Sequence, residues 1–123
     1  MIIKESAENY LETIYVLKNK NGNVRSIDVA TELGFSKPSV SVAMKKFREE
    51  GYISIDESGY ITLTESGLEI AAGVYERHEI IAKALIAIGV SEEVAYEDSC
   101  RIEHDISNET FDKIKKHVLA YAK

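Results

Sequence analysis

Residues 26–64, SIDVATELGFSKPSVSVAMKKFREEGYISIDESGYITLT, contain two helical patterns followed directly by two short strand patterns. Gly34 follows the first apolar-periodic stretch, at the left-handed position that ends many helices. Ser36 can cap a second helix that has Pro38 in its first turn, where a missing N–H costs little, and that runs to Gly51. The stretch therefore predicts a helix-turn-helix.

The end of this stretch alternates apolar and polar residues on both sides of a turn at residues 56–59, DESG. This pattern is typical of a β-hairpin, and a hairpin directly after a helix-turn-helix is a wing. Asp56 and Glu57 at the tip would repel phosphate. We therefore expect the hairpin mainly to close a small core with its alternating isoleucines.

Helical periodicity dominates the rest of the chain, over residues 6–20, 65–88, 91–104 and 107–123. The expected fold is mainly α with one small β-hairpin, a winged helix-turn-helix lobe followed by a helical lobe. Because no linker-like tract interrupts the pattern, the boundary is placed inside the long helix, which gives lobes of residues 1–72 and 73–123.

Composition narrows the class of protein. A chain of 123 residues with 45% hydrophobic and 29% charged residues is in the normal globular range. It contains no apolar run of the length of a signal peptide or membrane span, so we expect a cytoplasmic protein with no membrane partner. Its net charge of −6 argues against nonspecific coating of nucleic acid, so DNA binding requires a local basic patch.

The second helix of the helix-turn-helix supplies such a patch. Short hydroxyl side chains and a proline lie at its start, where they can approach base edges, and lysines follow with no acid before Glu49. The alternative is an ordinary solvated basic face. The candidate residues for contact with double-stranded DNA are Arg25, Ser36, Lys37, Pro38, Ser39, Ser41, Val42, Lys45 and Lys46.

A second functional pattern lies near the C-terminus. Cys100, Glu103 and His104 are spaced i, i+3 and i+4, so they would project from one face of a helix. Thiol, carboxylate and imidazole are the side chains that bind a transition-metal dication. Because Cys100 is the only cysteine, it cannot form an intramolecular disulfide and is available as a ligand.

Further donors lie on two other predicted helices. His78 falls on an apolar stripe with Val74 and Ile81, and Asn9 and Glu12 border the apolar stripe of the first helix. His78 alone is more often a satisfied core histidine than a ligand, and Glu12 alone can be a surface acid. Together the candidates allow one or two metal sites, and a metal that joined these helices would control DNA binding.

The second half also predicts a homodimer. Five apolar residues of the long helix leave more apolar surface than one small lobe can enclose, namely Ile80, Ile81, Ala84, Leu85 and Ile88. Two copies would place two recognition helices on successive major-groove faces and so read an inverted repeat.

Two alternatives remain at this stage. A metal-independent winged-helix regulator would share the first half of the chain, but it gives no reason for the donors of the second half. A small zinc hydrolase would use a His, Cys and Glu site with an open position. The sequence has no HExxH motif and no separate general base, so we expect neither an enzyme nor a small-molecule substrate.

The segments SAENYLETIY, FSKPSVSVAMKKF, ERHEII and SCRIEHDIS resemble the diphtheria-toxin-repressor and manganese-transport-regulator family of metal-dependent transcriptional repressors. The likeness covers nearly the whole chain. It implies a winged-helix lobe, a helical dimerisation lobe, and a homodimer that binds a palindromic operator when loaded with Fe²⁺ or Mn²⁺. Larger members add an SH3-like domain, and this chain resembles the short form without it.

By position, the resemblance places the metal donors on Asn9, Glu12, His78, Cys100, Glu103 and His104. Iron-type members have a thiol at the position of Cys100, whereas manganese-type members have a carboxylate there. Asn9 matches neither the methionine of iron-type members nor the aspartate of manganese-type members, and it offers a neutral oxygen.

The resemblance and the chemistry of the donors lead to expectations about a second metal site, the operator and the bound metal. A second site of iron-type members falls partly on Ala82 and Tyr96, so it is expected to be incomplete, and Val42 replaces a longer polar residue, which should alter the operator that is read. Thiolate and imidazole favour Fe²⁺ over Mn²⁺, and Zn²⁺, Co²⁺ or Ni²⁺ could substitute in vitro.

Overall fold

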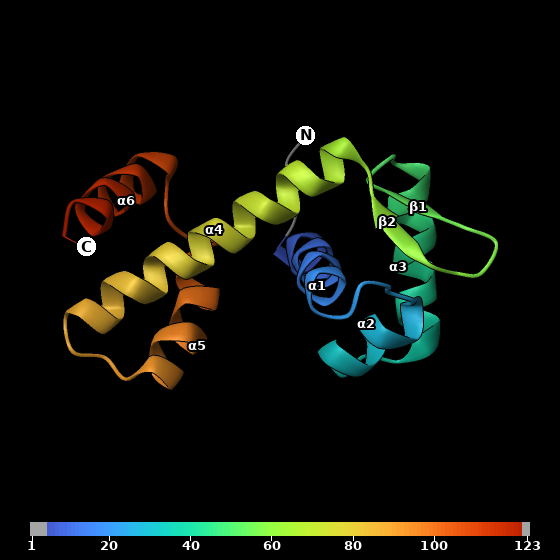
Figure 1. Ribbon diagram of the computed structural model, residues 1–123, viewed down its shortest axis with the longest axis horizontal. Coiled ribbons are helices and arrows are strands. Elements are labelled where there is room, and N and C mark those ends of the chain that lie inside the picture. The colour runs from blue at the N-terminus through green and yellow to red at the C-terminus, as the bar shows by residue number, and fades with distance from the viewer. Residues whose placement is uncertain (1–4, 122–123) are drawn as a thin grey trace. The chain divides into compact units, whose positions relative to one another are not determined.

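The computed structural model describes residues 5–121, and the side chains of residues 7–120. Figure 1 labels the elements, six helices and two strands, in chain order. They are α1 (Glu5–Asn21), α2 (Ser26–Leu33), α3 (Lys37–Glu49), β1 (Ile53–Ile55), β2 (Ile61–Leu63), α4 (Glu65–Ala87), α5 (Glu92–Ile102) and α6 (Asn108–Tyr121). The predicted fold, mainly helical with one small hairpin, is confirmed.

The chain divides into two compact units, Met1–Ala72 and Gly73–Lys123, with the boundary inside α4. Each unit has its own cluster of buried apolar side chains. Within the described part of the chain, no helix is both long enough and apolar enough to cross a bilayer.

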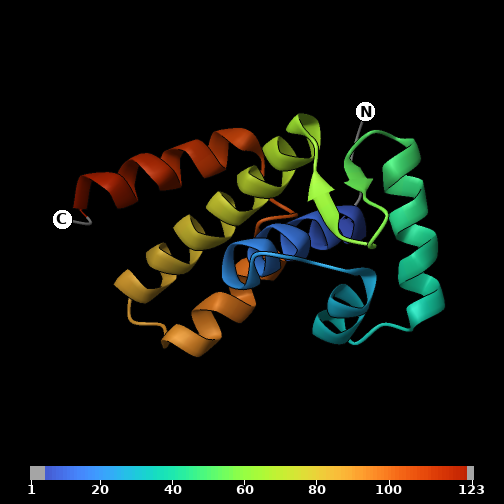
Figure 2. The same ribbon diagram turned by 45° about the vertical axis from the view of Figure 1, so that its right-hand side comes forward.

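The first unit is built around the helix-turn-helix. Figure 2 shows the hairpin beside α3. α1, α2, α3 and the hairpin share one core, whose fully buried members include Leu11, Ile14, Val24, Val29, Val40, Met44 and Ile61. Tyr10 adds edge-to-face contacts to Phe35 and to Phe47, with ring centroids 5.7 Å apart in each case. This core fixes which face of α3 remains exposed.

Local signals set the ends of α2 and α3. The Arg25 N–H donates to Asp28 Oδ2 over 2.9 Å at the start of α2. Gly34 ends α2 in the left-handed region at φ 71°, as predicted. Ser36 caps α3, since its hydroxyl accepts from the Ser39 N–H over 3.3 Å.

The hairpin has a turn built by Asp56. β1 and β2 are antiparallel, with Ser54 opposite Thr62. Asp56 Oδ1 accepts from the N–H groups of Ser58 and Tyr60, each over 2.9 Å, so this carboxylate serves the turn. Ile53 and Ile61 are buried, as expected of a hairpin that closes the core.

Hydroxyl groups connect the end of α3 to the start of α4. The carbonyl oxygen of Gly51 accepts from Thr64 Oγ1 over 2.6 Å and from Ser66 Oγ over 3.2 Å. Thr64 Oγ1 also accepts from the Gly67 N–H over 3.2 Å and so caps α4. The start of α4 is therefore bonded directly to Gly51, the second residue after α3.

Gly67 is needed for this close approach. A Cβ built at Gly67 would overlap the backbone carbonyl of Tyr52. We expect Gly67→Ala to lower the free energy of unfolding by about 1–3 kcal/mol, because backbone must shift to accommodate the methyl group. Urea denaturation of the full chain measures this change.

Gly73 provides the matched control. It is an exposed glycine of the same helix, and a Cβ there meets no described atom within 4 Å. Gly73→Ala should raise stability by roughly 0.5–1 kcal/mol, because alanine is the better helix former. Equal effects of the two substitutions would contradict the packing argument.

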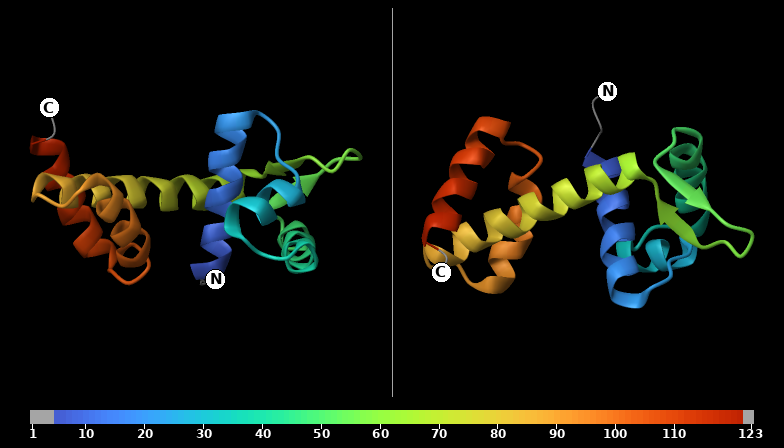
Figure 3. Two further views of the ribbon diagram at one scale, coloured as in Figure 1. Left: turned by 90° about the horizontal axis from the view of Figure 1, so that it is seen from below. Right: turned by 45° about the horizontal axis from the view of Figure 1, so that its top comes forward.

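The second unit packs α5 and α6 beside the C-terminal part of α4, as Figure 3 shows. Ile80 and Ile81 of α4 are only 7% and 2% exposed, because Phe111 and Val118 of α6 cover them. The expectation that these two isoleucines remain at the surface for a dimer contact is therefore wrong. Of the five apolar residues predicted there, Ile88 is the strongly exposed one, at 77%.

Candidate metal centre and nucleic-acid interface

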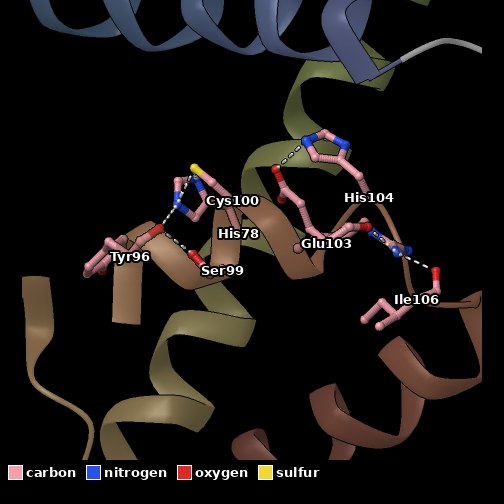
Figure 4. A network of polar contacts seen from close by, with 8 residues as sticks. His78, Tyr96, Ser99, Cys100, Glu103, His104 and Ile106 are labelled. Atoms are coloured by element: carbon pink, nitrogen blue, oxygen red, sulfur yellow. Dashed lines mark hydrogen bonds and ion pairs between the residues drawn. The ribbon is translucent and has the colours of Figure 1, made fainter. Parts of the chain in front are cut away.

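His78 and Cys100 meet between two helices of the second unit. His78 comes from α4 and Cys100 from α5. Cys100 Sγ lies 3.2 Å from His78 Nε2 and 3.8 Å from His78 Nδ1 (Figure 4). His78 Nε2 also lies 3.1 Å from the backbone oxygen of Tyr96. Two of the predicted soft donors are therefore neighbours in space, although 22 residues separate them in the sequence.

Glu103 and His104 form a second pair close by. Their side chains are 1% and 5% exposed, and His104 Nε2 lies 3.4 Å from Glu103 Oε1 (Figure 4). Nitrogen of His78 and carboxylate oxygen of Glu103 lie within 4.8 Å of one another. The second unit therefore brings four of the six predicted donors into one cluster.

The prediction of one shared helix face is wrong in detail. α5 ends at Ile102, and Glu103 and His104 belong to the turn that follows it. Glu103 keeps helical angles, φ −58° and ψ −28°, so its side chain still follows the helix, whereas Cys100 lies fully within α5. The turn, as well as the helix, determines where the carboxylate and the second imidazole point.

The donor set fits a transition-metal dication. Two imidazoles, a thiol and a carboxylate together suit iron, cobalt, nickel and zinc. Of these groups, the carboxylate is the hardest donor and has the weakest preference for these metals. Burial of a carboxylate is costly unless positive charge lies near it, and a dication supplies that charge.

The remaining two predicted donors lie in the first unit. Asn9 and Glu12 are three residues apart on α1, and both are half-buried. Their role as metal ligands stays a prediction.

The positions of the second iron-type site have other roles here. Ala82 is fully buried and offers no donor atom. The hydroxyl of Tyr96 donates to Glu79 Oε2 over 3.0 Å. This bond to the Glu79 carboxylate, together with burial, raises the pKa of Tyr96 above its usual value, so the phenol stays protonated.

The predicted DNA-binding residues belong to the first unit and precede or lie on α3. All nine are exposed, and Val42 is 70% exposed in the middle of α3. Ser36 Oγ donates to Ser39 Oγ over 2.8 Å, which orients two hydroxyls at the start of α3. The guanidinium of Arg25 lies 4.5 Å from the centre of the Tyr60 ring. Exposure leaves these side chains available to a duplex.

Sequence reasoning missed Tyr60 and Arg77. Tyr60 supports the Arg25 guanidinium, and Arg77 bonds to the turn that carries Glu103. Tyr60 could have been found from its place at the end of the wing turn. Arg77 gives no such signal, because its hydrogen-bond partners lie 26 to 31 residues further along the chain.

Family models match both halves of the chain. Residues 3–60 match the N-terminal DNA binding domain of iron dependent repressors. Residues 64–121 match the iron dependent repressor metal binding and dimerisation domain.

Curated relatives agree with these matches. The transcriptional regulator MntR of Escherichia coli O157:H7 is 34% identical over 112 residues, which cover 91% of this chain and 72% of the relative. The HTH-type transcriptional regulator MntR of Geobacillus kaustophilus is 35% identical over 109 residues, which cover 89% of this chain and 77% of the relative.

Solved structures share the fold. The crystal structure of the metal-dependent transcriptional regulator MtsR matches 94% of this chain with a TM-score of 0.83 and 27% identity. A manganese-dependent transcriptional repressor in complex with manganese matches 91% with a TM-score of 0.83 and 24% identity, which bears on the fold alone. The present chain spans 54% and 52% of those two chains.

Proposed function

Because this chain belongs to the diphtheria-toxin-repressor and manganese-transport-regulator family of metal-dependent transcriptional repressors, we propose that a divalent metal controls its binding to a palindromic operator. The family consists of DNA-binding regulators that act as homodimers, so the chain is a regulator and not an enzyme. The zinc-hydrolase alternative is therefore set aside.

One observation carries the proposal. Four candidate metal donors, from α4, α5 and the turn after α5, converge in the second unit, with 3.2 Å between His78 and Cys100 and 3.4 Å between Glu103 and His104. A regulator that needed no metal would have no use for a thiol, two imidazoles and a buried carboxylate in one cluster. The metal-independent alternative leaves this convergence without an explanation.

We propose that Asn9 and Glu12 of α1 complete the site with oxygen donors. A metal held by donors of both units would restrict the first unit, which carries the recognition helix, and so favour one arrangement of the DNA-reading surface. We propose one metal site per subunit. At the positions of the second iron-type site, Ala82 has no donor atom and the Tyr96 hydroxyl is already bonded to Glu79.

The thiol of Cys100 favours Fe²⁺ over Mn²⁺ as the activating metal. The relatives named MntR indicate a manganese response for those proteins, and this chain differs from the manganese-type pattern by having a thiol instead of a carboxylate. Zn²⁺, Co²⁺ and Ni²⁺ would also bind such donors in vitro. Regulation of an operator would take place in the cytoplasm.

Fluorescence anisotropy with duplex DNA from upstream of the protein's own gene tests the proposal. With the salt concentration held fixed, anaerobic Fe²⁺ should strengthen binding at least about tenfold relative to chelator. Mn²⁺ and Zn²⁺ are measured in parallel. A duplex that carries one half-site should bind more weakly than one with both half-sites.

Two outcomes would contradict the proposal. Equal affinity in metal and in chelator would restore the metal-independent regulator. Equal affinity for one half-site and for two would argue against the palindromic operator, because a symmetric dimer gains from the second half-site.

A further inference from the structure

Arg77 joins α4 to the turn after α5 and to the start of α6. Its Nη2 donates to the backbone oxygen of Glu103 over 2.9 Å and to that of Ile106 over 3.2 Å. Its Nη1 donates to Asn108 Oδ1 over 3.2 Å. The guanidinium also lies 4.8 Å from the centre of the Phe111 ring. One side chain thus contacts four residues of a single short segment.

That segment carries two of the candidate metal donors. Glu103 and His104 lie in the turn after α5, and Asn108 begins α6. The turn, residues 103–107, contains neither glycine nor proline to fix its backbone. Arg77 can fix the backbone of the turn from outside, because it donates hydrogen bonds to a carbonyl near each end of the turn.

Arg77 also precedes His78 on α4. α4 therefore supplies the imidazole of His78 and, from the adjacent residue, the guanidinium that is bonded to the turn of Glu103 and His104. Figure 4 shows the turn, with the Ile106 carbonyl bonded to the guanidinium, next to Glu103 and His104.

From this geometry we propose that Arg77 is a positioning residue of the metal centre, which fixes Glu103 and His104 relative to His78. The inference rests on the proposed function, since it assigns Arg77 to the same site. A planar guanidinium can serve several acceptors at once and can stack on a ring, whereas a lysine ammonium cannot reproduce that geometry. Its fixed positive charge also suits the carbonyl groups at the C-terminal end of α5.

Co²⁺ titration of the full chain tests this role. Arg77→Gln should weaken Co²⁺ binding about 10-fold to 100-fold, which is the usual effect of substituting a residue that orients metal ligands. Absorption from thiolate to Co²⁺ should persist at saturation, because Cys100 and His78 lie on helices and contact each other directly. The ligand-field bands should change, because Glu103 and His104 would no longer be held.

Arg101→Gln is the matched control. Arg101 follows Cys100, is exposed, and pairs with Asp98 across 3.6 Å on the surface. The substitution removes the same charge next to Cys100 but affects an ion pair within α5 instead of the bonds to the turn. Co²⁺ affinity and spectrum should match those of the wild type.

Further measurements separate positioning from stability. In the metal-free protein, amide hydrogen exchange over residues 103–107 should be faster in Arg77→Gln, while exchange over the rest of α5 is unchanged. Arg77→Lys should recover only part of the Co²⁺ affinity. If Arg77→Gln does not fold, Asn108→Ala removes one exposed acceptor and should weaken Co²⁺ binding by a smaller factor in the same direction.

The outcomes distinguish the two proposals. Wild-type affinity and ligand-field bands in both Arg77→Gln and Asn108→Ala would overturn the role of Arg77 and leave the metal site intact. Full rescue by Arg77→Lys would also overturn it, since charge alone would then suffice. A wild-type protein that binds no Co²⁺ would instead overturn the proposed function, and the positioning role with it.

Discussion

Cys100→Asp is expected to shift the metal response of operator binding from Fe²⁺ toward Mn²⁺, changing the ratio of half-maximal concentrations by about 100-fold, or about 2.8 kcal/mol. The thiolate is a soft ligand that Mn²⁺ binds poorly, whereas a carboxylate is a hard ligand that suits it. Because Cys100 is exposed and lies within α5, the exchange should leave the fold of the second unit intact. Anaerobic anisotropy titrations with each metal give the ratio.

Cys100→Ser separates loss of the thiol from gain of the carboxylate. A serine hydroxyl is neutral and weakly ligating, so this variant should lose response to both metals without gaining a preference for Mn²⁺. If Cys100→Asp kept the wild-type ratio of Fe²⁺ to Mn²⁺ potency, Cys100 would not set the metal preference.

Lys45→Gln combined with Lys46→Gln should weaken operator binding about 100-fold at low salt, because a dimer would lose four phosphate contacts. Both lysines are exposed on α3, the helix expected to enter the major groove. Each phosphate contact contributes about 0.9 to the slope of log affinity against log salt, so the slope should fall by about 3.6. Titrations at several salt concentrations, with the activating metal saturating, provide both quantities.

Lys113→Gln combined with Lys116→Gln gives the matched control. These two lysines are exposed on α6 in the second unit, so the net charge changes equally while the recognition helix is untouched. The control should keep the wild-type slope. A drop of equal size in both double variants would mean that overall charge, and not contact by α3, determines the salt dependence.

Much of the fold was predictable because its signals are local. Gly34 ends α2 with a positive φ, and Ser36 caps α3 with its hydroxyl, both as the sequence predicts. Gly59 in the wing turn and Gly89 after α4 also have positive φ. Such signals act within a few residues, so the sequence alone exposes them.

The end of α5 was not predictable in the same way. The predicted helix continues to His104, whereas the observed one ends at Ile102. No glycine or proline marks this end, and the bond from Arg77 to the Glu103 carbonyl comes from 26 residues away. Burial of Ile80 and Ile81 under α6 was missed for the same reason, since it depends on tertiary packing.

The candidate metal cluster was predictable in part, because some of its contacts are local and others depend on tertiary packing. The spacing of Cys100, Glu103 and His104 predicts neighbours along the chain, and the structure places His78, which the sequence also named as a candidate, 3.2 Å from the thiol. That contact requires α4 and α5 to pack against each other, which periodicity indicates but does not fix in register. The six ligands named from the sequence remain a prediction.

The Gly51 carbonyl, which accepts hydroxyl bonds from Thr64 and Ser66, has a mechanical consequence. Since Gly51, two residues after the end of α3, is hydrogen-bonded to the start of α4, α3 cannot rotate independently of that part of α4 without breaking both bonds. The base-reading surface should therefore respond to a signal by moving as a rigid body, and its internal packing should be the same in the inducing and the repressing state.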